Sequence, residues 1–116
     1  MAADDSMQRI DTLLSHLWMV RTFLKHSEEA EEDEELRDVH RGLYDYMLAL
    51  GAPLEAGDAA AYLKQAGKKY SKLKKAAELF LEIQPEVSSH TNFKMAARSL
   101  TAVVDEIGQV LSGGAE

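Results

Sequence analysis

Apolar residues recur at spacings of three and four along most of the chain, which is the pattern of amphipathic α-helices. The clearest run follows the acidic N-terminus and comprises Ile10, Leu13, Leu14, Leu17, Val20 and Leu24. Similar runs recur further along, separated by short stretches that contain Gly, Pro or Ser, and their inner positions include Leu43, Phe80 and Leu100. The pattern predicts four helices, near residues 5–27, 33–51, 57–84 and 89–112.

The predicted ends of these helices rest on residues that stop or start a helix. Gly51 adopts a left-handed cap conformation readily and Pro53 cannot donate the next hydrogen bond, so we expect the second helix to end there. Pro85 ends the third helix because it lacks the backbone donor as well. Ser88 or Ser89 supplies the N-cap of the fourth helix.

Short joints between long helices place consecutive helices antiparallel to one another. We therefore predict an all-α fold, an antiparallel up-down-up-down four-helix bundle. A chain of 116 residues is the size of one domain, so we expect a single bundle over residues 1–116. Short flexible tails are expected at 1–4 and 112–116.

Composition narrows the class of protein. The chain has 46% hydrophobic and 28% charged residues, as globular domains do. It contains no Cys, which excludes disulfides and thiolate metal sites. The sequence has neither a signal-like N-terminus nor an apolar run of the roughly 18 residues that a membrane-spanning helix needs. We therefore expect a cytoplasmic protein with no membrane partner.

Charge is divided unevenly along the chain. Residues 1–58 carry 14 acids and five bases, whereas residues 59–116 carry six acids and eight bases. Half of the acids of residues 1–58 lie between Glu28 and Glu35, where their repulsion predicts a mobile joint over 28–33. A basic stripe lies on the third predicted helix at Lys64, Lys68, Lys72 and Lys75. This stripe is either a solvated face or a surface for phosphate or an acidic partner, while the net charge of −7 disfavours nucleic acid.

Several large apolar residues fall outside the inner faces of the first two predicted helices. They are Trp18, Met19, Phe23, Tyr44 and Leu48. They either cover the seams of the bundle or form a second apolar face, of the kind that marks a contact with a partner. We favour the second interpretation and predict a homodimer through the first two helices, or a contact with another protein.

Two polar residues fall on inner faces of the predicted helices. Arg21 and His40 lie part-way along the first and second helices, and a buried charge is costly unless it is paired. They predict a buried polar layer, with tyrosines or a carboxylate as partners. The layer either sets the register of the helices or lines a ligand pocket.

One short pattern and one cluster bear on chemistry. The segment Arg21-x4-His26 resembles the Arg-x4-6-His motif of the HEPN superfamily of small helical ribonucleases, in which the Arg steadies a phosphate and the His transfers protons. Here His26 falls on the back of the first helix while Arg21 faces inward. The antiparallel topology also brings His26, His90 and several Glu residues to one end, where a divalent metal is the alternative interpretation.

The chain as a whole favours a non-enzymatic protein. No nucleophile arrangement, phosphate-binding loop or paired-carboxylate spacing is present in the sequence. We therefore predict no catalytic residues, no metal ligands and no cofactor. The expected function is that of an interaction or scaffold protein that self-associates, with a ribonuclease or a metal-binding bundle as the alternatives.

Overall fold

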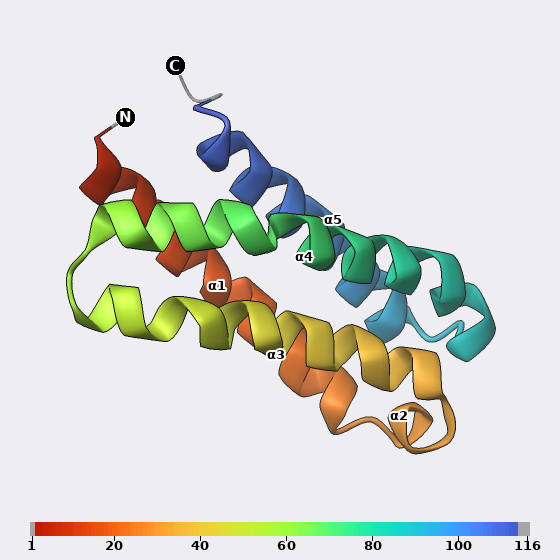
Figure 1. The fold of residues 1–116 in the computed structure, drawn as a ribbon. Coiled ribbons are helices and arrows are strands. Elements are labelled where there is room, and N and C mark those ends of the chain that lie inside the picture. Colours follow the sequence, from red (N-terminus) through yellow and green to blue (C-terminus); the bar gives the residue numbers. More distant parts are fainter. Residues whose placement is uncertain (1, 114–116) are drawn as a thin grey trace.

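The chain folds into helices, as its apolar pattern predicts. The computed structural model describes residues 2–113 (Figure 1). Its helices are α1 (Ala3–Lys25), α2 (Glu28–Glu32), α3 (Glu34–Glu55), α4 (Ala59–Val87) and α5 (Thr91–Leu111). The described part of the chain contains no β-strand, which confirms the all-α class.

The four long helices pack around a shared interior. In Figure 1, α3 and α4 run side by side in front, and α1 and α5 lie behind them. α1 packs against α3 and α5, and α4 packs against the same two helices. The short α2 contacts α1 and α3 at the end of the molecule that is opposite the start of α1.

The prediction of four helices is wrong in number, because the acidic joint itself forms a fifth helix. The Ser27 side chain accepts a hydrogen bond from the Ala30 amide at the start of α2. The Arg37 guanidinium donates to the carbonyls of Ala30 and Glu31 at 2.9 and 3.0 Å. Ala30 is buried. These caps and one apolar anchor hold a segment whose like charges alone predicted a mobile joint.

The predicted end of the second helix at Gly51 is also wrong. α3 continues through Gly51 and Pro53, and the chain takes its left-handed turn at Gly57, where φ is 67°. Leu54 packs against the core. A proline within a helix removes one hydrogen bond, and the burial of Leu54 in the next turn offsets that loss.

The remaining helix ends shift for similar reasons. α4 passes Pro85 and ends at Val87, whose side chain packs against the core. α5 is capped by His90, whose Nδ1 accepts from the Asn92 amide at 3.0 Å, and neither Ser88 nor Ser89 takes that place.

At its start the chain is helical from Ala3, so the tail predicted at 1–4 is shorter than expected. Residues 1 and 114–116 of the predicted tails lie outside the described residues.

The core takes side chains from every long helix. Among the fully buried residues are Leu17 of α1, Leu43 of α3, Phe80 of α4 and Leu100 of α5. These four residues belong to the stripes that the sequence spacing places on inner faces. The apolar periodicity therefore identifies most of the interior, whereas Tyr46 and Ile83 are buried outside the predicted stripes.

Two tyrosines tie neighbouring helices together through hydrogen bonds. The Tyr46 hydroxyl donates to the Ala66 carbonyl and the Tyr70 hydroxyl donates to the Val104 carbonyl, each at 3.0 Å. Burial raises the pKa of both phenols, so both stay protonated and able to donate. Each bond satisfies a polar group that would otherwise be buried alone.

Candidate functional site

The outer seam between α1 and α3 carries a stack of one cation and two aromatic rings. The Arg21 guanidinium carbon lies 4.8 Å from the centre of the Trp18 ring and 4.7 Å from that of Tyr44. Both distances lie within the range of attractive cation–π contacts. Trp18 is 46% exposed and Tyr44 is 37% exposed, so the stack reaches the surface. We call these three residues the aromatic–arginine stack.

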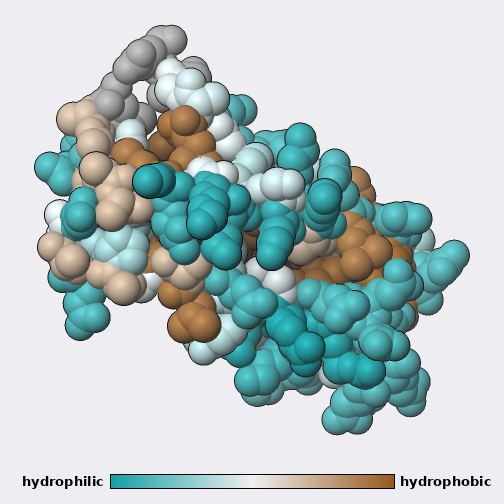
Figure 2. All heavy atoms as spheres, viewed as in Figure 1, coloured by the Kyte–Doolittle hydropathy of each residue, from teal (hydrophilic) through white to brown (hydrophobic). Residues whose placement is uncertain are grey.

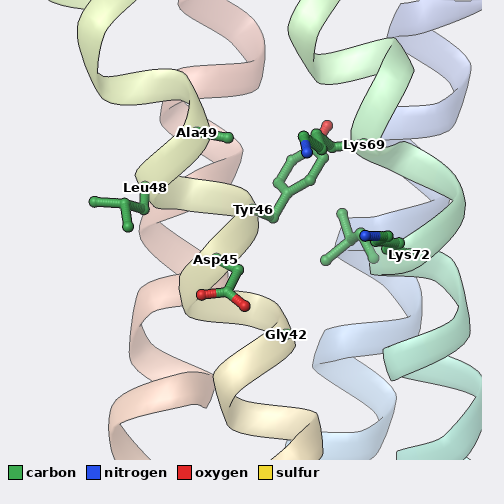
Figure 3. Close-up of a pocket in the computed structure, with 8 residues that line it drawn as sticks. Gly42, Asp45, Tyr46, Leu48, Ala49, Lys69 and Lys72 are labelled. Atoms are coloured by element: carbon green, nitrogen blue, oxygen red, sulfur yellow. The ribbon is translucent and has the colours of Figure 1, made fainter.

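The sequence positions these residues by helical spacing. Trp18 and Arg21 are three residues apart on α1 and therefore neighbours on its surface. Tyr44 comes from α3, which packs along α1. Leu48 follows Tyr44 by one turn, is 64% exposed, and extends outward from α3 at the rim of the groove between α3 and α4 (Figure 3). The stack and Leu48 thus belong to the outer side of the α1–α3 pair.

A group of cations continues the seam toward α2. His40 is half-buried, and its pKa is lowered first by burial and then by the charges of Arg21, Arg41, Lys25 and Arg37. These four residues are four of the five bases in residues 1–58. We call them the basic cluster. Arg21 and Lys25 are four residues apart on α1, and Arg37 and Arg41 are four residues apart on α3, so each pair shares one helix face. The packing of α1 against α3, which brings the two pairs together, cannot be read from the sequence alone.

Ion pairs do not neutralise the basic cluster. Within residues 2–113, the ion pair that forms joins Arg9 to Glu106 at 2.9 Å, and no carboxylate pairs with a member of the cluster. The Nε atom of Arg21 is buried and has no hydrogen-bond partner among the described residues. Among the described residues, the seam therefore holds four cations that form no ion pair.

Arg21 and His40 lie less deeply in the fold than the predicted buried polar layer. Both residues are half-buried at a seam. Of the predicted tyrosine partners, Tyr44 stacks on Arg21, whereas Tyr46 and Tyr70 bond to carbonyls elsewhere.

Protonation of His40 is expected to destabilise the fold. The unfolded chain binds this proton with the ordinary pKa of 6.5, whereas the folded chain, with its lowered pKa, resists it. The contribution of His40 is therefore fully present above pH 6.5 and is lost as the pH falls below that value. Urea unfolding at pH 7.5 and 5.5 checks this. The His40→Gln variant should lose less stability over that interval than the parent, and an equal loss contradicts the prediction.

The five residues predicted for an interface do not form one face. Trp18, Tyr44 and Leu48 lie on the outer α1–α3 side, and Met19, 67% exposed, follows Trp18 around α1. Phe23 instead packs edge-on against Phe93 of α5, with ring centres 5.0 Å apart, and lies half-buried against the core. The expectation that Phe23 lies on the outer surface is therefore wrong, because the opposite flank of α1 meets α5.

The basic stripe of the sequence lies on α4. Lys64, Lys68, Lys72 and Lys75 are all exposed. Lys72 also lines a groove of about 350 Å³ between α3 and α4. Figure 3 shows this groove, with Asp45 and Lys72 extending from opposite helices and Tyr46 directed toward α4.

Sequence reasoning missed the groove between α3 and α4. Gly42 and Ala49 on α3 line it and are seven residues apart, so they share one helix face. An added Cβ at Gly42 would lie 3.3 Å from the Cβ of Ala76. This face of small residues, which allows close approach of α4, was the available signal.

The two residues of the ribonuclease-like motif lie in different surroundings. His26 ends α1 as its exposed C-cap residue, while Arg21 lies in the aromatic–arginine stack. In the described part of the chain, no three His, Asp or Glu side chains come together as metal ligands would. None of the helices described combines the length and apolar character needed to cross a membrane.

Comparison of the chain with protein-family models, curated proteins and solved structures finds no match. A function is therefore inferred from the side chains of the α1–α3 seam.

Proposed function

We propose that this protein is a non-enzymatic interaction module that self-associates through the outer side of α1 and α3. The observation that carries the proposal is the aromatic–arginine stack, in which Trp18, Arg21 and Tyr44 reach solvent together. Trp, Tyr and Arg are the three residue types most enriched among the residues that dominate binding at protein interfaces. With Leu48 beside them, they make the interaction face.

Association strengthens the contacts that already exist in the stack. A cation–π contact contributes about 0.5–1 kcal/mol at an exposed site and about 2 kcal/mol once water is removed. Burying an apolar side chain such as Leu48 adds roughly 1.5–3 kcal/mol. Because the Arg21 side chain is already held between two rings, less conformational entropy is lost on binding.

The favoured partner is a second copy of the chain, placed by a twofold axis. Such an axis sets the same face of both copies against each other, so each copy buries the aromatic–arginine stack of its partner. We also propose that the four long helices form an antiparallel up-down-up-down bundle, with α2 inserted between the first two. This arrangement supports a rigid face made by α1 and α3.

Sedimentation at micromolar concentration tests the proposal. The parent chain should form a dimer, and Trp18→Ala should raise the dissociation constant at least tenfold while far-ultraviolet circular dichroism stays unchanged. Met95→Ala is the matched control, because Met95 on α5 is 48% exposed, close to the 46% of Trp18. It should leave the dissociation constant within about twofold.

Two results would contradict the proposal. One is a monomer of the parent chain at 100 µM, at both low and high salt. The other is a dimer that Met95→Ala weakens as much as Trp18→Ala does, because the contact would then not belong to the α1–α3 side.

A further inference from the structure

The end of the interaction face nearest α2 brings opposite charges side by side. Lys25 ends α1 and Arg37 lies near the start of α3, so the basic cluster adjoins the acidic segment that spans Glu28–Glu35. Figure 2 shows hydrophilic side chains over the end of the molecule where α2 lies. The two patches are neighbours, yet no carboxylate of the described chain forms an ion pair with the cluster.

Five of the seven acidic side chains of this segment are exposed to solvent. Glu28, Glu31, Glu32, Glu34 and Glu35 are exposed. Arg37 is bound instead to backbone carbonyls of α2, which hold its guanidinium in place. Each patch therefore repels itself and presents unpaired charge to an approaching molecule.

We propose that the acidic segment of one copy docks on the basic cluster of a second copy, in both directions at once. The inference rests on the proposed self-association and specifies its register. A twofold axis that lies in the interface between the two patches brings each onto the opposite patch of the partner. The dimer then places carboxylates beside four cations that form no ion pair among the described residues of one copy.

The lysine stripe of α4 is the competing basic surface. Its members Lys64, Lys68 and Lys75 lie on a helix that contributes nothing to the aromatic–arginine stack. The basic cluster shares Arg21 with that stack, so a single contact buries the aromatic rings and pairs the charges. We therefore place the acidic segment on the cluster rather than on α4.

Two charge-reversed variants test this register. Variant one carries Lys25→Glu and Arg41→Glu, two exposed positions of the basic cluster. Variant two carries Glu31→Lys and Glu32→Lys, at the end of α2, where cations suit the helix dipole. Variant one leaves the basic cluster with no net charge, and variant two lowers the charge of the acidic segment from −7 to −3, so each variant alone loses attraction between the patches. In the heterodimer of an equimolar mixture, one contact is that of the parent, and the other sets the introduced glutamates against the introduced lysines.

Sedimentation at 50 mM salt should show each variant at least tenfold weaker in self-association than the parent. Their mixture should recover a heterodimer with an affinity within about threefold of the parent dimer. Raising the salt to 500 mM should weaken the parent dimer several-fold, because the added salt shortens the Debye length and screens the attraction between the two patches. Circular dichroism of each variant confirms that it remains folded.

The matched control is Lys64→Glu with Lys68→Glu on α4, which should dimerise as the parent does. If this control dissociates and pairs with variant two, the acidic segment docks on α4 and the inference is overturned. If both variants dimerise as the parent does, or if their mixture forms no heterodimer, the inference fails while self-association stands. A monomeric parent chain instead contradicts the proposed function itself.

Discussion

Phe23→Ala is expected to lower the free energy of unfolding by about 2–3 kcal/mol. Phe→Ala in a core costs about 3–5 kcal/mol, and Phe23 is half-buried, so the expected loss lies below that range. The ring packs edge-on against Phe93, with centres 5.0 Å apart, and the variant removes that contact and leaves a gap between α1 and α5. For a chain of this length the thermal midpoint should fall by about 10 °C.

Trp18→Ala is the matched comparison for the stability loss of Phe23→Ala. Trp18 is 46% exposed and touches Arg21 on the surface, so its loss should cost less than about 1 kcal/mol of stability. Chemical unfolding followed by circular dichroism measures both variants. Equal losses of stability would contradict the placement of Phe23 in the core and Trp18 on the interaction face.

Gly108→Ala is expected to lower the free energy of unfolding by about 1–3 kcal/mol, the usual range for overpacking. A Cβ at Gly108 would meet the Tyr70 hydroxyl at less than van der Waals distance and its Cζ at 2.9 Å. Tyr70 cannot move away freely, because its hydroxyl donates to the Val104 carbonyl at 3.0 Å. Urea unfolding measures the loss.

Gly67→Ala is the matched control for this substitution. It is also a glycine within a long helix, and nothing lies within 4 Å of an added Cβ. It should gain about 0.5–1 kcal/mol, since Ala restricts the unfolded chain. In a Tyr70→Phe background, which lacks the nearest atom, Gly108→Ala should cost less. An equal cost in both backgrounds would contradict the steric origin of the effect.

The sequence by itself determined the helical class and most of the interior. Residues such as Leu17, Leu43, Phe80 and Leu100 recur at three-and-four spacing, and a helix with such a stripe must bury it. Spacing also placed Trp18 and Leu48 outside the core. These features are local, because each follows from the positions of residues on one helix.

The ends of the helices were decided by tertiary packing. Leu54 and Val87 lie beyond Pro53 and Pro85, and both pack against the core. A proline predicts the end of a helix because it removes one hydrogen bond. The sequence does not show that the residues after it are stabilised by packing against the core. The acidic joint forms α2 for a comparable reason, because Arg37 of α3 donates a hydrogen bond to the Ala30 carbonyl of α2.

The candidate site was determined only in part by the sequence. Arg21, Tyr44 and His40 were each placed near a seam or inner face, but their mutual contacts depend on how α1 and α3 are set against each other. Only the fold separates Phe23 from Trp18, because the two flanks of α1 meet different neighbours. Periodicity defines the faces of one helix, whereas the three-dimensional packing decides which face meets another helix and which is left to solvent.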